Sequence, residues 1–538
     1  MADAARGRFA AGRHAGVIAP LFSIPSAASW GMGEIPDLPL LARWLEAAGL
    51  DFIQLLPINE MQAGQSSPYS GLSAMAIDPI FIAVERCEDF RGAGGLERMS
   101  AEGRESVTRL QRSRRVDYEL VRATKREALH VAFDHFTRHA SDKSTRRASF
   151  EAFVEREAWW LDTYALFRAL HDERAGCYWR EWEEPLRDRD PAVLADARDR
   201  LASSVRYYQY VQWLADEQWQ QARSACGAVG LLGDFPFMVN GHSADVWARQ
   251  GEFHLDASVG VPPAPESPEG QDWGLPPYRW EVVAPGGYEW LAQRTRRCAE
   301  LFDGFRVDHL VGFYRTFIRA HDGPSGFSPP DEAAQLAQGE ALMALFRSHG
   351  SRIIAEDLGV VPDFVRVSQT RQQVPGLKVL RWEREWEQQG RPFRDPRAYA
   401  PCSVAISGTH DTESMAEWWS AADPDERQAV LSIMGEPGDP ISPADPFSDR
   451  IRDALLSTLF HAGSDFTLVA LPDIFGWRDR INVPSSLDDE NWTWRLPWPV
   501  EMLTTSPEGT ARAAFLRTLA SASNRTRNLE PTGTLNEP

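Results

Sequence analysis

The chain alternates short apolar runs with segments of helical periodicity, and this alternation constrains its fold more than any other feature. Eight runs have the near-continuous apolar character of strands that are buried on both faces. Helical patterns lie between most of them, such as residues 331–349, where Asp331 is a candidate N-cap. The eight runs are residues 15–23, 51–58, 229–239, 302–310, 351–358, 377–382, 403–410 and 466–474.

Eight strands that alternate with helices predict an α/β protein, specifically a (β/α)₈ barrel (a TIM barrel) with parallel strands. The alternative is an open, doubly wound sheet. That alternative is less favoured, because no glycine-rich phosphate-binding pattern follows the first strand.

The interval between the second and third strands is too long for one connection, so we expect an insertion there. Residues 82–226 show helical periodicity and high charge, which predicts a mainly helical subdomain over the barrel mouth. The expected regions are barrel strands one and two in residues 1–81, the insertion in 82–226, and strands three to eight with loops and a C-terminal helix in 227–538. Roughly 40 residues follow Trp498, too few for a C-terminal β-sandwich.

The composition of the sequence limits the classes of binding partner that we expect. The sequence has 57 lysines and arginines against 77 aspartates and glutamates, a formal charge of −20, which disfavours nucleic acid and anionic membranes. No apolar segment has the length of a signal peptide or a membrane span, so we expect a cytoplasmic protein with no membrane partner. The five cysteines are scattered and never form Cys-x-x-Cys, which predicts free thiols and no metal site.

Tryptophan is abundant, with 20 residues, among them Trp159 and Trp160 in the insertion. The indole ring is an amphipathic plate that stacks on flat apolar faces, including sugar rings. Large proteins also pack tryptophan in their cores, and composition does not separate the two roles.

Residues 302–317 place a cation and a carboxylate at the end of the predicted fourth strand. With a period of two, Arg306 and Asp308 face one side of the strand, while Phe305 and Val307 face the other. Taken alone, the pair is typical of a structural ion pair at a strand end.

Other predicted strands also end in carboxylates. Asp234 ends the third, Glu356 and Asp357 the fifth, and His410 with Asp411 the seventh. The C-terminal ends of barrel strands converge on one mouth, and packing alone does not explain several carboxylates there. Such a cluster could bind a hard cation through oxygen ligands. It could equally cleave a glycosidic bond, with one carboxylate as nucleophile and another as proton donor.

Several motifs, in order and over nearly the whole chain, resemble the 4-α-glucanotransferase family, the amylomaltases or disproportionating enzymes of the α-amylase clan. The matching stretches are residues 67–79, 233–234, 243–247, 261–263, 273–274, 305–309, 355–359, 374–379, 408–411, 480–482 and 491–495.

The resemblance implies a retaining transferase that moves α-1,4-glucan segments between maltooligosaccharide, starch or glycogen acceptors, with glucose as acceptor or product. It makes Asp308 the nucleophile, Glu356 the general acid and base, and Asp411 the third carboxylate. No organic cofactor and no metal ligand is implied. The expected substrate contacts are Tyr69, Asp234, Arg306, His309, His410, Trp273 and Asn482. Residues 262–273 are the candidate lid over the mouth.

The chain departs from the family pattern at Asp78, Ala264, Leu275 and the pair Leu310 and Val311. None of these is one of the three carboxylates, so the departures bear on acceptor specificity and on the balance of transfer and hydrolysis. Two competing functions remain: an α-glucan hydrolase of the same clan, and a non-catalytic glucan-binding protein on a decayed barrel. The short C-terminal tail argues against the first, and the intact carboxylates argue against the second.

Overall fold

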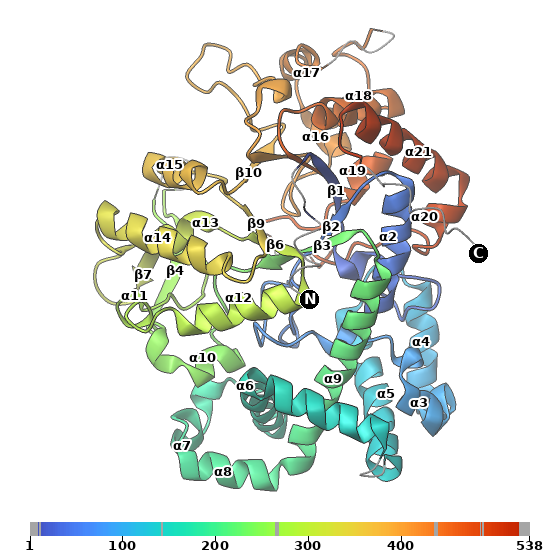
Figure 1. Cartoon of the computed structure of the whole chain (residues 1–538), viewed down its shortest axis with the longest axis vertical. Helices are drawn as coiled ribbons and strands as arrows, with labels where there is room; N and C mark the ends of the chain where they lie inside the picture. Colours follow the sequence, from blue (N-terminus) through green and yellow to red (C-terminus); the bar gives the residue numbers. More distant parts are fainter. Residues whose placement is uncertain are drawn as a thin grey trace, which may run out of the picture.

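A computed structural model describes residues 9, 12–140, 144–263, 268–434, 440–484, 486 and 489–526. Its centre is a closed barrel of eight parallel strands (Figure 1), which confirms the predicted fold class. Around the barrel the order is β1, β12, β11, β10, β9, β6, β3, β2. The strands are β1 (His14–Ile18), β2 (Phe52–Gln54), β3 (Gly230–Phe235), β6 (Gly304–Val307), β9 (Arg352–Ala355), β10 (Gly376–Val379), β11 (Ser403–Ile406) and β12 (Phe466–Ala470).

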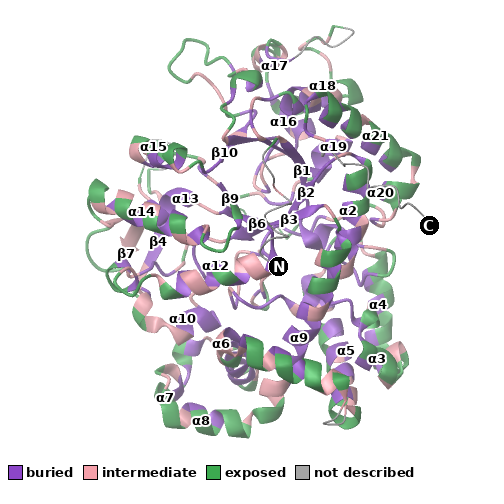
Figure 2. Ribbon diagram, in the orientation of Figure 1, coloured by how far each residue is buried: buried purple, intermediate pink, exposed green. Residues whose placement is uncertain are grey.

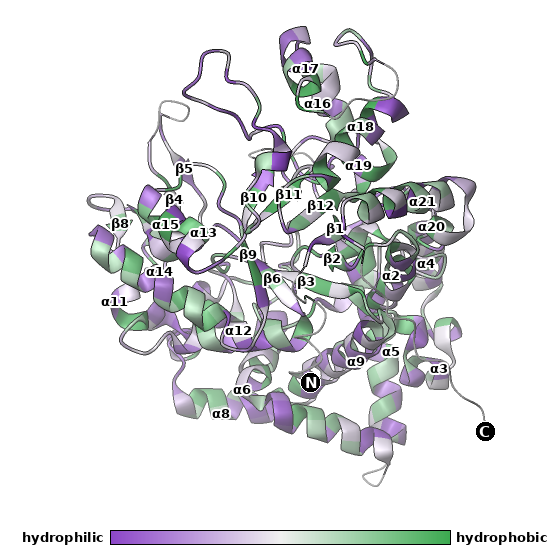
Figure 3. Cartoon of the chain, turned by 45° about the horizontal axis from the view of Figure 1, so that its top comes forward, coloured by the Kyte–Doolittle hydropathy of each residue, from purple (hydrophilic) through white to green (hydrophobic). Residues whose placement is uncertain are grey.

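All eight strands lie inside the predicted apolar runs or overlap them, and several runs continue into the loop that follows the strand. The barrel interior is filled by a cluster of apolar side chains from alternate positions, as expected for a packed core. Its members are Ile18, Phe52, Leu232, Ile354, Leu377, Val379, Val404, Ile406, Phe466 and Leu468. The barrel strands are buried in Figure 2 and largely hydrophobic in Figure 3.

Helices surround the barrel, and their ends carry the expected capping residues. The side chain of Asp331 accepts a hydrogen bond from the Ala334 amide at the start of α14 (Glu332–Phe346), as predicted. Ser506 caps the C-terminal helix α21 (Pro507–Ala522) in the same way. Gly49, which ends α2 (Leu38–Ala47), has a positive φ of 71° that favours glycine.

A helical insertion separates β2 from β3. Among the described residues of this interval there are helices but no strand. The α-helices are α3 (Glu88–Ala93), α4 (Ala101–Arg112), α5 (Tyr118–His139), α6 (Thr145–Glu173), α7 (Glu184–Arg187), α8 (Pro191–Arg200) and α9 (Ala202–Ala225). Figure 1 shows α9 running from the outer end of the insertion back to β3. The boundaries at residues 81 and 226 stay a prediction.

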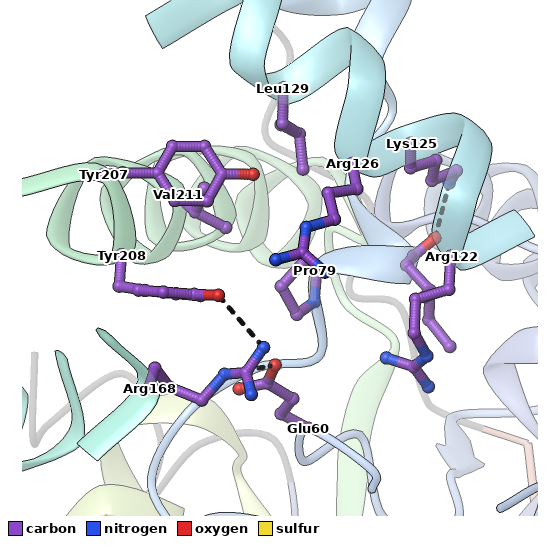
Figure 4. Close-up of a pocket in the computed structure, with 11 residues that line it drawn as sticks. Glu60, Pro79, Arg122, Lys125, Arg126, Leu129, Arg168, Tyr207, Tyr208 and Val211 are labelled. Atoms are coloured by element: carbon purple, nitrogen blue, oxygen red, sulfur yellow. Dashed lines mark hydrogen bonds and ion pairs between the residues drawn. The ribbon is translucent and has the colours of Figure 1, made fainter. Parts of the chain in front are cut away.

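A buried ion pair and a buried hydrogen bond join the insertion to the segment after β2 (Figure 4). The Arg168 guanidinium on α6 lies 3.1 Å from the Glu60 carboxylate and donates to the Tyr208 hydroxyl on α9. On α5, the Lys125 ammonium donates to the Ile80 carbonyl. Breaking buried pairs of this kind costs several kcal/mol, so they fix how the insertion sits on the barrel.

A second, smaller sheet was not predicted. Its order is β5 (Gln271–Asp272), β4 (Ala257–Val261), β7 (Thr316–Ala320) and β8 (Gly326–Ser328), all antiparallel. It is built from the connections that follow β3 and β6. The predicted lid at residues 262–273 therefore contains part of a strand pair, and its residues 264–267, including Ala264, lie outside the described residues.

Three other expectations can be compared with the structure. All five cysteines are free, as predicted. Beyond β12, the described residues form helices and turns but no strand. None of the described helices has the length and apolar character needed to cross a membrane.

Candidate active site

Arg306 lies at the centre of the polar cluster at the C-terminal ends of the barrel strands. Strand register sets it level with Asp234 on β3. Its Nη1 donates to both Asp234 carboxylate oxygens, at 2.9 and 2.7 Å, and its Nη2 lies 2.9 Å from Asp308 Oδ1. Burial opposes the charge of Arg306, but Asp234 and Asp308 raise its pKa well above the usual value. The guanidinium therefore stays a fixed positive charge among the carboxylates.

Asp308 and Glu356 meet at the same guanidinium nitrogen. Glu356 Oε2 lies 3.8 Å from Arg306 Nη2, the atom that also contacts Asp308. The two carboxylates can be no farther apart than the sum of these distances, which is close to the lower limit of the roughly 6.5–9.5 Å found in inverting glycosidases. This upper bound admits the roughly 5–5.5 Å spacing of retaining glycosidases. The Phe237 amide donates to Asp308 Oδ2 at 3.3 Å and helps to orient this carboxylate.

Glu356 follows β9 and has the environment of a proton donor. Its side chain is 14% exposed and accepts hydrogen bonds from the His309 amide at 2.7 Å and the Leu358 amide at 3.1 Å. Burial raises the pKa of Glu356 to about 7; Arg306 opposes this rise and the neighbouring Asp308 adds to it. A carboxyl group with this pKa is partly protonated at neutral pH.

Asp234 and Tyr69 form the inner wall of the cluster. The Asp234 side chain is fully buried and accepts a 2.8 Å hydrogen bond from the Tyr69 hydroxyl in addition to those from Arg306. Burial raises the pKa of Asp234 to about 7, against the opposing attraction of Arg306. The Tyr69 ring stacks on His410, with ring centroids 5.3 Å apart.

His410, Asp411 and Asn482 form the third part of the cluster. The Asn482 amide donates to Asp411 Oδ1 at 2.6 Å, and His410 Nε2 lies 3.4 Å from Asp411 Oδ2. Burial lowers the pKa of His410, which favours the neutral ring. The Asp411 side chain is 42% exposed, which leaves its carboxylate open to a ligand.

His309 and Trp273 extend the cluster from Glu356. Their ring centroids are 4.9 Å apart in an edge-to-face arrangement, and burial lowers the pKa of His309 to about 4. His309 has a positive φ of 45°, an uncommon conformation that lets its amide face Glu356. The Trp273 amide donates to the Val259 carbonyl, so the small sheet holds the indole beside the barrel mouth.

The structure thus connects all ten predicted site residues through a chain of direct contacts. Sequence reasoning missed two aromatic neighbours. Trp492 lies 5.9 Å from the Tyr69 ring and 5.5 Å from the His410 ring, and Phe237 lies 5.3 Å from the His309 ring. Trp492 belongs to the motif at residues 491–495, so the motif was the available signal.

The described residues contain no group of three or more His, Cys, Asp or Glu side chains arranged to hold a metal ion. What the cluster offers instead is an Arg-oriented carboxylate beside a carboxyl group that is protonated near neutrality. This pair can form and break a covalent bond to a sugar carbon, with proton transfer to the departing oxygen.

Comparisons with known proteins identify the family of this chain. A family model described as 4-alpha-glucanotransferase matches residues 19–502. A 4-alpha-glucanotransferase of Thermus thermophilus is 33% identical over 502 residues, covering 90% of this chain and 93% of that protein. One of Chlamydia muridarum is 30% identical over 499 residues, covering 91% and 92%.

Solved structures show the same fold. The amylomaltase from Streptococcus agalactiae, in complex with acarbose, superposes with a TM-score of 0.79 at 23% identity, covering 96% of this chain and 100% of that one. The amylomaltase from Corynebacterium glutamicum gives a TM-score of 0.76 at 23% identity, covering 96% and 76%. With the family model matching most of the sequence, the chain belongs to the 4-α-glucanotransferase family of enzymes.

Proposed function

We propose that this enzyme transfers α-1,4-glucan segments between maltooligosaccharides, starch or glycogen by two displacements, through a covalent glucosyl-enzyme on Asp308. The observation that carries the proposal is the position of Asp308 and Glu356 on one nitrogen of Arg306. That position sets the Asp308 carboxylate beside the Arg306 cation and places the protonated Glu356 within reach of the same bond.

In the first step an Asp308 oxygen attacks the anomeric carbon of the donor glucan. The bond between this carbon and the bridging oxygen breaks, and the Glu356 proton moves to that oxygen, so the leaving chain departs with a new hydroxyl group. The ester on Asp308 and the ionised Glu356 remain.

In the second step an acceptor 4-hydroxyl attacks the same carbon. Glu356, now ionised, takes the hydroxyl proton, the new glycosidic bond forms, and Asp308 leaves as a carboxylate. Two inversions give net retention. A free glucose molecule can serve as acceptor, or be released when the leaving chain is a single unit.

The other residues of the cluster bind the sugar. Asp411, held by Asn482 and exposed to a ligand, accepts from ring hydroxyls, while the neutral His410 supplies a further hydrogen bond. Trp273 and His309 provide an apolar plate next to Glu356. Acarbose bound to the Streptococcus agalactiae amylomaltase is consistent with a sugar-binding site in this fold.

Transfer rather than hydrolysis requires that an acceptor sugar reach the intermediate before water does. We assign this shielding to the segment around Trp273, which the small sheet holds next to His309. The free cysteines fit the predicted cytoplasmic location, which stays a prediction.

Incubation with pure maltotriose tests the function. A glucanotransferase converts it into free glucose and a ladder of longer oligosaccharides, which thin-layer or anion-exchange chromatography resolves. A hydrolase would give only shorter products. Saturable glucan binding with no products would instead mean a binding protein.

Tyr69 allows a matched test of the inner wall. Its hydroxyl donates to Asp234 at 2.8 Å, and in the insertion the Tyr210 hydroxyl donates to Asp89 at the same distance. Both Tyr69→Phe and Tyr210→Phe should lower the free energy of unfolding by about 1 kcal/mol, measured by urea denaturation. Only Tyr69→Phe should lower kcat, by about tenfold, because the freed Asp234 oxygen loosens Arg306. Equal kcat losses in both variants would reduce Tyr69 to a structural residue.

A further inference from the structure

A cavity of about 270 Å³, separate from the polar cluster at the barrel mouth, lies between the insertion and the barrel helices. Its walls come from α6, from α10 (Ala244–Ala248) and from α12 (Glu289–Leu301), which lie side by side in Figure 1. None of the ten site residues lines it. A single buried water needs only about 10–15 Å³, so this space can hold a small organic ligand.

The walls combine flat aromatic side chains with polar groups. Trp159, Trp160 and Trp290 line the cavity together with Asp245 and Gln293. Two arginines, Arg189 and Arg249, and the hydroxyl groups of Ser73 and Thr163 complete the polar lining. Indole plates next to carboxylate, amide and guanidinium groups suit a ring that has apolar faces and a rim of hydroxyls.

Two polar atoms of the lining have no hydrogen-bond partner among the described residues, whereas Arg249 pairs with Glu252 and Gln293. Among the described residues, no carboxylate forms an ion pair with Arg189, and no cation forms one with Asp245. Within the same part of the chain, the Trp159 indole N–H and the Arg189 Nη1 have no hydrogen-bond partner. Buried polar groups are normally paired, so a ligand or ordered water is expected to complete them.

The chemistry of the walls narrows the ligand. A phosphate would be repelled by the Asp245 carboxylate, whose Oδ2 already accepts from the Ala74 amide at 2.7 Å. A purely apolar ligand would leave the Trp159 indole N–H and the Arg189 Nη1 desolvated without a hydrogen-bond partner. A neutral polyhydroxylated ring meets both conditions, because its hydroxyls can donate to Asp245 and accept from arginine.

We propose that this cavity is a second saccharide site, which binds a glucose unit of an α-glucan away from the reacting bond. The choice of glucose among neutral sugars rests on the proposed function. Position links the site to the cluster at the barrel mouth: the Ala244 amide donates to the Leu72 carbonyl and Asp245 holds Ala74, a few residues from Tyr69. An occupant therefore contacts Asp245, which holds the segment that carries Tyr69.

Calorimetric titration with maltose tests the proposal on the Asp308→Asn protein, which prevents turnover. We expect two binding events. Ala248→Leu fills the cavity and Gln293→Ala removes a polar wall group, so each should abolish one event and leave the other. Gln428→Ala, at an exposed glutamine on α17 (Pro424–Leu431), is the matched control and should leave both.

Hydrogen exchange locates the event independently. Maltose should slow amide exchange in peptides covering residues 72–78 and 159–163, and Ala248→Leu should remove this protection while melting normally. One binding event that neither cavity variant affects would overturn the proposal, as would binding of inorganic phosphate in place of maltose. If maltose gives a single binding event and Ala248→Leu abolishes it, the cavity is confirmed as a saccharide site. That outcome would count against the proposed function instead, because the polar cluster would then bind no maltose.

Discussion

Replacing Asp308 with asparagine is expected to lower kcat for maltotriose transfer by about 10⁴-fold or more, the scale seen when an enzyme loses its nucleophile. The asparagine amide is nearly isosteric with the carboxylate but cannot form the glucosyl ester. Because Arg306 keeps its two hydrogen bonds to Asp234, the fold around the cluster should persist. The measurement is the initial rate of glucose release and ladder formation, together with a thermal melt.

The control for this variant lies at the other end of the same strand, β6. Asp303 immediately precedes β6, at the end opposite Asp308, where it accepts from the Leu231 amide and pairs with Arg223. Conserved chemistry in barrels sits at the C-terminal strand ends, whereas the other face contributes stability. Asp303→Asn should therefore lower the melting temperature and keep kcat. Transfer by Asp308→Asn within about tenfold of wild type would exclude Asp308 as nucleophile.

The barrel could be predicted from the sequence because a strand that is buried on both faces appears as a short apolar run. Strands such as β9 and β12 are covered by helices outside and core side chains inside, so they appear as short apolar runs between helical segments. The carboxylates that end them were predictable for a related reason, since polar residues directly after a buried run must lie at the barrel mouth. Asp308, Glu356 and Asp411 were found in this way.

The small sheet left no comparable pattern. β4 pairs with β7 across an interval that contains β6, and β5 is a two-residue strand in a stretch rich in proline and glycine. Pairing between distant, partly exposed segments depends on tertiary contacts rather than on local periodicity. The position of Trp273 beside His309 follows from this pairing, so the sequence could name Trp273 but not place it.

Electrostatic detail was also beyond the sequence. The alternation in residues 302–310 predicted that Arg306 and Asp308 share a side, but strand register decides that Asp234 takes both hydrogen bonds from Nη1 and that Asp308 and Glu356 share Nη2. The stacking of Tyr69 on His410 is equally non-local. Such contacts set the pKa of Glu356, which a list of carboxylates cannot give.

The raised pKa of Glu356 predicts a strong pH dependence of the transfer reaction. Because burial raises this pKa to about 7, the proton needed for the first step is present below pH 7 and is lost as the pH rises through it. For the wild-type enzyme, kcat/KM for maltotriose should therefore fall tenfold per pH unit above about pH 7. Glu356→Gln should lower kcat by about 10²–10⁴-fold, the usual contribution of general acid–base catalysis.

A substrate that does not need the proton separates this role from binding. Fluoride leaves α-maltosyl fluoride without protonation, so Glu356→Gln should release one equivalent of fluoride quickly and then stall, because no base activates the acceptor. The stalled protein should carry the added maltosyl mass on the peptide containing Asp308. Asp357→Asn is the matched control, since the Asp357 carboxylate accepts from the Leu377 amide and Gln369 instead.

The pH profile of Glu356→Gln shows whether Glu356 or Asp234 is the group whose titration lowers the activity above pH 7. Asp234 also has a pKa raised to about 7 by burial, so its titration would produce a limb at the same pH. Glutamine does not titrate, and the residual activity of Glu356→Gln should therefore lose the fall above pH 7 if Glu356 is the acid. If that fall persists, the group that titrates near pH 7 is Asp234 and not Glu356. The change in charge balance around Arg306, rather than loss of the proton donor, would then limit the reaction.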